Sequence, residues 1–162
     1  MKAGWTETIL TASVLVGAAA SPAAAQRVTL TANMTGGGET PAIVTGSFGS
    51  ATVIVNVPAQ TISYRVDVVN LPSGATGGHI HVGPKEIVSG PIIFNFNVPN
   101  NISNDFSVSG AFSCADVTLR PDQGIRSCED AIQAVAGGNA YVNVHSAVNP
   151  GGEIRGQLIV KQ

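Results

Sequence analysis

The chemistry that this chain could perform centres on its histidines, of which the whole sequence has three. His79 and His81 flank one apolar residue, and His145 ends a run of alternating residues later in the chain. Side chains two residues apart in a strand share a face and lie about 6.6 Å apart, so both imidazoles of a His-x-His motif can converge on one ion. If the strand ending at His145 lies close by, three imidazoles point at one place.

Three neutral imidazoles with an open coordination position suit a copper or zinc ion. The affinity order of the divalent metals favours copper over zinc. Groups that fix which ring nitrogen binds a metal come from neighbouring side chains and carbonyls, and Asn143 and Glu153 are the candidates. Arg155, two residues after Glu153, could guide an anion to the ion.

Glu153 and Arg155 also have a plain structural interpretation. Both lie on the last expected strand, two positions apart, and the structural interpretation is a cross-strand ion pair on the solvent face. Such a pair is worth at most about 1 kcal/mol. Glu39, in a glycine-rich turn, is a further candidate carboxylate ligand, although a residue in such a place is more often solvated.

A metal-free alternative must be kept beside the metal site. Exposed strands often carry polar residues at alternate positions, so the histidines could be surface residues of an interaction or structural module. The sequence has no Gly-x-Ser-x-Gly elbow and no phosphate-binding glycine loop, and no catalytic residue is assigned. The sequence therefore favours a binding protein over an enzyme.

The elements that would position these residues are short strands. Residues 61–68 alternate in polarity with a period of two, which is typical of an antiparallel sheet with one face in water. A short helix is predicted to begin after the N-cap Ser127 and to end at Gly137. We expect an all-β fold, an antiparallel Greek-key-like β-sandwich with this one helix, and strands at residues 27–32, 51–57, 61–68, 79–82, 91–97, 106–112, 140–145 and 153–160.

The N-terminal segment predicts export. Lys2 precedes an apolar stretch at residues 9–20, and Ala25 ends a run of small residues that a signal peptidase could read. We expect a signal peptide at residues 1–25 and one domain at residues 26–162, located in the periplasm or secreted. The apolar stretch is shorter than the roughly 20 residues that span a membrane, so no span is expected after signal removal.

Composition limits the partners. Charged residues are 11% of the chain, the net charge is −2, and there is no basic cluster to neutralise phosphates. Nucleic acid is therefore not an expected partner, whereas a metal ion and an extracellular or periplasmic protein are.

Two cysteines, Cys114 and Cys128, would meet an oxidising compartment after export, where such a pair is expected to form a disulfide. Closing a loop of this length stabilises the fold by about 3 kcal/mol in the chain-entropy account. The alternative is a pair of unlinked buried thiols.

The same residues resemble the CHRD domain, named from chordin and widespread in exported bacterial proteins. The resemblance rests on three motifs and covers nearly the whole mature chain: Glu39-Thr40-Pro41, Gly78-His79-Ile80-His81-Val82-Gly83, and Tyr141-Val142-Asn143-Val144-His145 followed by Pro150-Gly151-Gly152-Glu153-Ile154-Arg155-Gly156-Gln157-Leu158. It implies a compact exported β-sandwich. A fainter similarity connects the Gly-x-His-x-His motif to copper-zinc superoxide dismutases, which use a further histidine that this chain lacks.

Overall fold

A computed structural model describes Met1 and residues 26–162 of the protein. The expected signal peptide, apart from Met1, lies outside the described residues. Within Met1 and residues 26–162, no helix is long and apolar enough to cross a membrane.

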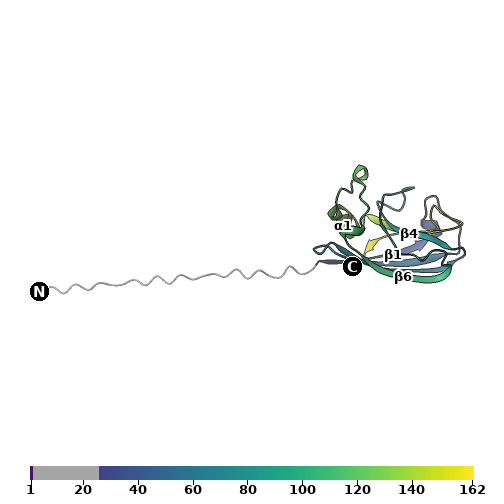
Figure 1. The fold of residues 1–162 in the computed structure, drawn as a ribbon, viewed down its shortest axis with the longest axis horizontal. Coiled ribbons are helices and arrows are strands. Elements are labelled where there is room, and N and C mark those ends of the chain that lie inside the picture. Colours follow the sequence, from purple (N-terminus) through teal and green to yellow (C-terminus); the bar gives the residue numbers. More distant parts are fainter. Residues whose placement is uncertain (2–25) are drawn as a thin grey trace.

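The described domain is built almost entirely of strands (Figure 1). Three 3-10 turns and one α-helix complete it. The elements are β1 (Arg27–Thr35), η1 (Gly36–Gly38), β2 (Phe48–Asn56), β3 (Thr61–Leu71), β4 (Ala75–Val82), β5 (Ile92–Asn95), β6 (Asn104–Phe112), η2 (Cys114–Asp116), η3 (Pro121–Gln123), α1 (Cys128–Ala136), β7 (Ala140–Ser146), β8 (Ile154–Gln157) and β9 (Ile159–Val160).

The expected all-β class, antiparallel pairing and single α-helix are confirmed. The strands form one continuous sheet in the order β5-β4-β7-β8-β1-β2-β3-β6, and β9 also pairs with β1. This sheet curves into a nearly closed, barrel-like shape, so the two layers of the expected sandwich are two parts of one sheet (Figure 1).

The apolar side chains that alternate along the strands fill the interior of this curved sheet. Along β3, the expected inward residues Ile62, Tyr64, Val66 and Val68 are all buried while their neighbours Ser63 and Arg65 are exposed. β2 and β3 form a hairpin, with Asn56 paired to Thr61 across its turn. The period-two pattern therefore located the core correctly.

One expected strand is divided in the structure. Residues 153–160 form two short strands, β8 and β9, separated by Leu158, whose side chain is buried in the core. The backbone N–H of Leu158 donates to the carbonyl of Ala140, while β9 turns to pair with β1 at Leu30 and Thr31. β8 thus lies between β7 and β1, whereas β9 pairs with β1 alone.

The helix α1 begins where the sequence predicts. The Ser127 side chain accepts a hydrogen bond from the backbone N–H of Asp130, and Gly137 follows the last helical residue. Ile132 and Val135 on one face of α1 are fully buried in the core. The predicted disulfide between Cys114 and Cys128 is present and ties η2 to the start of this helix.

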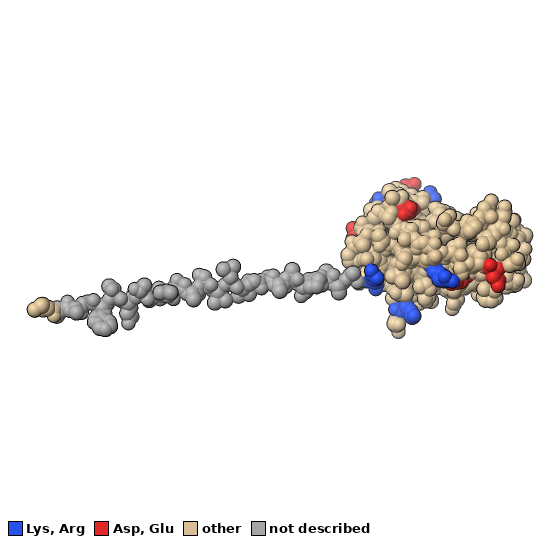
Figure 2. Space-filling model, turned by 60° about the horizontal axis from the view of Figure 1, so that its bottom comes forward, with Lys and Arg blue, Asp and Glu red and all other residues tan. Residues whose placement is uncertain are grey.

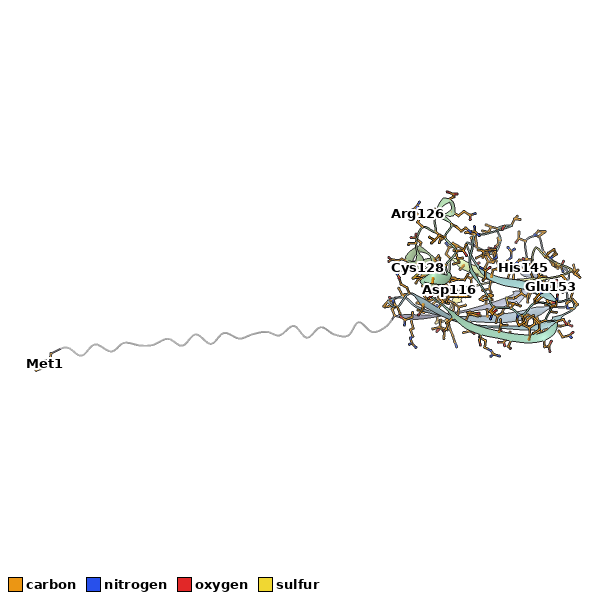
Figure 3. All side chains as sticks on the ribbon, in the orientation of Figure 1. Met1, Asp116, Arg126, Cys128, His145 and Glu153 are labelled. Carbon is orange, nitrogen blue, oxygen red and sulfur yellow. A yellow bond between two sulfur atoms is a disulfide. The ribbon has the colours of Figure 1, made fainter. Side chains whose placement is uncertain are left out.

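The disulfide and the histidines lie in different parts of the domain. Figure 3 shows Cys128 near α1 and His145 with Glu153 toward the other end of the sheet. On the face drawn in Figure 2, lysine and arginine side chains are scattered and do not gather into a patch.

Candidate metal centre

The three histidines come from two neighbouring antiparallel strands, β4 and β7. In their register His79 lies opposite Asn143, His81 opposite Tyr141, and Gly77 opposite His145. Because side chains alternate along a strand, all of these residues share one face, whereas Ile80 and Val142 and Val144 point into the core and are fully buried. The condition that the sequence left open is met, since the two strands share a sheet.

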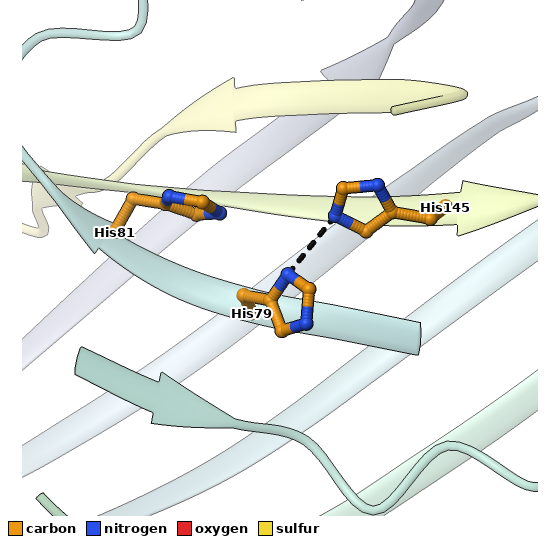
Figure 4. Close-up of side chains that lie close together, drawn as sticks. All are labelled: His79, His81 and His145. Carbon is orange, nitrogen blue, oxygen red and sulfur yellow. Dashed lines mark hydrogen bonds between the residues drawn. The ribbon is translucent and has the colours of Figure 1, made fainter. Parts of the chain in front are cut away.

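The imidazole rings converge on one small region (Figure 4). The Nε2 atom of His145 lies 2.9 Å from Nδ1 of His79. The ring centroids of His79 and His81 are 5.5 Å apart. One ring nitrogen from each of the three residues lies within 4.8 Å of the other two. Nitrogens bound at about 2.0 Å to one ion are about 3 to 4 Å apart, so the rings would have to close on a bound ion.

Two backbone carbonyls fix the tautomers of two rings. Nδ1 of His81 lies 2.8 Å from the carbonyl oxygen of Gly90, and Nδ1 of His145 lies 2.9 Å from that of Pro150. A carbonyl oxygen only accepts, so each Nδ1 carries the hydrogen and each Nε2 keeps its lone pair. A backbone carbonyl behind a ligating histidine is the arrangement that orients imidazoles toward metals.

Burial keeps the three rings neutral. Desolvation, together with the charges that His145 and His81 would carry, lowers the pKa of His79 to about 4. Desolvation also lowers the pKa of His81 and of His145, against the raising effect of their carbonyl partners. At neutral pH all three imidazoles can therefore offer a lone pair without first losing a proton.

This face of the sheet is covered, not solvated. His81 is 4% exposed and Asn143 is 1% exposed. Two connections cover them, the 39–47 loop and the 83–91 loop, and Thr40 in the first donates a hydrogen bond to the carbonyl of Lys85 in the second. The face of β4 and β7 opposite to Ile80 is therefore also enclosed, and the side chains enclosed there are polar. We call this region the polar interior.

Asn143 and Tyr141 both contact His81 inside this polar interior. The Asn143 amide oxygen lies 3.1 Å from His81 Nε2. The Tyr141 ring stacks on the His81 ring with centroids 4.6 Å apart, and the Arg155 guanidinium carbon lies 4.5 Å from the centre of the same tyrosine. Asn143 was a predicted partner of the site, whereas nothing in the sequence singled out the part of Tyr141.

The expectation that Glu153 and Arg155 form an ion pair on the solvent face is wrong. Arg155 is 3% exposed, and its Nε lies 2.7 Å from the carboxylate of Glu39. Its Nη1 donates to the carbonyls of Lys85 and Ile87 at 3.0 and 2.8 Å, and its Nη2 donates to the carbonyl of Val88 at 3.5 Å. The view of Glu39 as a solvated turn residue is wrong for the same reason, because the loops that cover this face bury both charges together.

Glu153 is fully buried and has partners of its own. Its carboxylate accepts hydrogen bonds from four side chains, those of Thr45, Ser47, Ser146 and Asn149. Among the described hydrogen bonds of Glu153, none goes to a histidine. It joins the 39–47 loop to the turn after β7, which carries the Pro150 carbonyl behind His145.

A cavity of about 560 Å³ opens beside the histidines. His81 and His145 line it, together with Asn143 and Tyr141 from the strands, while His79 does not. Residues of the two covering loops and of the 147–153 turn form most of the rest of its wall, with Ile92 of β5 and Arg155 of β8. The histidine cluster is therefore accessible from one side.

These features define a small all-β protein with a cluster of three histidines under two loops. The family model described as the CHRD domain matches residues 30–158, which is most of the chain. The chain belongs to the CHRD-domain family. No curated protein and no solved structure matches it.

Proposed function

We propose that this protein is exported and binds one copper or zinc ion through His79, His81 and His145. The observation that carries the proposal is the convergence of three ring nitrogens, one from each histidine, within 4.8 Å of one another. Three imidazoles leave at least one coordination position open, as in centres that accept a further ligand.

The surroundings of the rings support metal binding as well. The carbonyls of Gly90 and Pro150 hold two rings in the tautomer that a metal needs, and burial favours the neutral form of all three. An ion would replace the hydrogen bond between Nδ1 of His79 and Nε2 of His145, once the His79 ring turns or moves its hydrogen to Nε2. Copper is preferred to zinc because an all-nitrogen site binds Cu²⁺ more tightly at equal availability.

Metal titration of the purified mature domain tests the proposal. We expect uptake of about one Cu(II) per chain, with couplings to imidazole nitrogens in the electron paramagnetic resonance spectrum. His81→Ala should abolish this signal, whereas Ser63→Ala, an exposed change on β3, should leave it intact. Copper uptake unchanged in His81→Ala would contradict the proposal.

Export rests on the N-terminal sequence, and the disulfide Cys114–Cys128 supports it because such bonds persist in oxidising compartments. The test is N-terminal sequencing of the protein recovered outside the cytoplasm of an expressing bacterium. We expect a chain that starts at Gln26. A chain retained in the cytoplasm with Met1 or Lys2 at its start would contradict export.

A metal-free interaction or structural module is the second candidate. Its support is the hydrogen bond between His79 and His145, which satisfies Nδ1 of the first ring and Nε2 of the second without an ion. Under this function, loss of any histidine changes stability but no metal is taken up, and the protein instead binds an extracellular or periplasmic partner.

A copper oxidoreductase of the superoxide dismutase type has less support. An anion guide needs a free cation near the ion, but the charge of Arg155 is balanced by Glu39 and its nitrogens contact loop carbonyls. Absence of superoxide turnover in the copper-loaded protein would remove this candidate.

A further inference from the structure

The cavity beside the histidines has a wall that is mainly apolar. Its apolar residues come from the two covering loops, from β5 and from the turn after β7. Val88 and Val148 are 71% and 70% exposed while lining the cavity, so they form part of its mouth. The apolar residues of the wall are Pro41, Ile43, Val88, Ile92, Val148 and Pro150. A volume of about 560 Å³ lies within the range of sites that bind small organic molecules.

The charged side chains of the wall leave no free charge for a ligand. Arg155 and Glu39 both line the cavity, yet they pair with each other at 2.7 Å and are both buried. The guanidinium Nη1 donates to the carbonyls of Lys85 and Ile87, and Nη2 donates to the carbonyl of Val88. An ionic ligand would therefore lose its hydration without gaining a partner of opposite charge.

The polar side chains at the histidine end of the cavity pair with one another. Nε2 of His145 lies 2.9 Å from Nδ1 of His79. Nε2 of His81 faces the amide oxygen of Asn143 at 3.1 Å, and the Asn143 side chain is almost completely buried. A ligand hydroxyl placed at this end would give up its water without gaining a free partner.

The other polar side chains of the wall are paired or solvated. The hydroxyl groups of Tyr141 and Thr40 each form a hydrogen bond with a backbone group. The Asn149 amide donates to the Glu153 carboxylate. Ser89 is exposed, so its hydroxyl stays in water when a ligand enters. The part of the wall that a ligand can cover with a gain in free energy is therefore the apolar part.

We propose that this cavity binds a small uncharged molecule through a hydrocarbon group, such as a benzene ring, without a hydrogen bond to the protein. The hydrocarbon group removes the valine, isoleucine and proline wall from water, including the two exposed valines at the mouth. The inference goes beyond the proposed function, because it adds a second ligand and needs no ion. His81 and His145 line the cavity, so the molecule lies beside the metal centre when an ion is bound.

The first test is a fluorine NMR titration of the metal-free protein with probes of similar shape. We expect 4-fluorotoluene to bind saturably with a Kd of about 1 mM or tighter. The probe 4-fluorobenzyl alcohol, which adds a hydroxyl group, should bind at least about threefold more weakly. The anion 4-fluorobenzoate and the cation 4-fluorobenzylammonium should bind at least about tenfold more weakly. Equal or tighter binding of the alcohol or of either ion, or no saturable binding of 4-fluorotoluene, overturns the inference.

Two variants then locate the site. Val148→Asp places a charge at the mouth of the cavity and should weaken the binding of 4-fluorotoluene at least about fivefold. Val44→Asp is the matched control, because Val44 is fully exposed on the 39–47 loop and does not line the cavity. The control should bind the probe within about twofold of the unaltered protein. If both changes weaken binding equally, or if neither does, the probe binds elsewhere and the inference is wrong.

Copper(II) measures where the probe lies relative to the histidines. An unpaired electron speeds the relaxation of a nearby fluorine nucleus, so the copper-loaded protein should broaden the signal of bound 4-fluorotoluene. Probe and copper bound together without broadening would overturn the placement beside His81 and His145. Copper uptake without saturable probe binding overturns the cavity inference alone. Probe binding without copper uptake overturns the metal proposal alone.

Discussion

His79 Nδ1 and His145 Nε2 lie 2.9 Å apart although the two residues are 66 positions apart in the sequence. Their meeting is a product of strand pairing, because β4 and β7 are neighbours in the sheet and place His145 opposite Gly77, two residues before His79. Gly77 has no side chain, and the His79 ring occupies the space beside it, with Nε2 3.5 Å from where a Cβ would be. The His79 ring therefore turns Nδ1 toward His145.

Asn143 should influence metal affinity without being essential for it. Its amide oxygen lies 3.1 Å from His81 Nε2, so the side chain packs against that ring and limits its rotation. Asn143→Ala should weaken Cu(II) binding by about 10- to 100-fold, the effect usual for groups that orient ligands. Competition titration with a chelator of known affinity measures this. A loss of all binding would instead make Asn143 a ligand, and no loss would remove it from the site.

Acid should destabilise the metal-free protein. The pKa of His79 falls from 6.5 to about 4 on folding, so between these values the unfolded chain binds a proton that the folded chain does not. Stability is therefore unaffected by this group above about pH 6.5 and is lost as the pH falls toward 4, by on the order of 2–3 kcal/mol. Thermal unfolding measured from pH 7.5 to pH 4 should show the decline.

His79→Gln is the control for this pH dependence. Glutamine does not titrate, so the variant should lose less stability over the same interval. Parallel curves for the two proteins would show that His79 is not the cause of the decline.

Glu153 should be a major determinant of stability. Burial by itself raises its pKa, but hydrogen bonds from Asn149, Thr45, Ser146 and Ser47 outweigh that effect and the pKa is lowered. In Glu153→Gln one acceptor oxygen becomes a donor facing hydroxyl and amide groups, which should cost about 2–4 kcal/mol in urea unfolding. Glu129→Gln, an exposed change on α1, should cost less than about 0.5 kcal/mol. Equal effects would contradict the assigned role.

Arg155 and Glu39 should be energetically coupled. Arg155→Met leaves the Glu39 carboxylate buried without its cation and should destabilise the fold by about 3–5 kcal/mol. Combining it with Glu39→Gln removes the uncompensated charge, so the double variant should be more stable than Arg155→Met alone. A double-mutant cycle in urea measures the coupling, and additive effects would mean that the pair does not interact.

Much of this architecture could be predicted from alternation and local signals. The apolar residues Ile80 and Val144 indicated which way each strand faces, and therefore that the histidines share the opposite face. Ser127 marked the start of α1, and the pair Cys114 and Cys128 indicated the disulfide. Each of these predictions depends on residues that are close together in the sequence, or on a residue type such as cysteine that has few other roles in an exported protein.

The burial of the opposite face could not be predicted in the same way. A strand with alternate polar residues has the same pattern whether its polar face meets water or a covering loop. The partners of Arg155 are Glu39 and backbone carbonyls of the 83–91 loop, and carbonyls carry no sequence signal. The ion-pair expectation for Glu153 and Arg155 was wrong because the paths of these long loops have no periodicity to read.

The two faces of β4 and β7 bury different kinds of side chain. Apolar groups surround Ile80 and Val142, and polar groups surround His81 and Asn143. Only the former belong to the apolar cluster that spans the domain. The apolar wall of the histidine compartment can consequently change what the compartment accepts, whereas its buried Glu39–Arg155 pair and the Glu153 network have to be kept for the domain to stay folded.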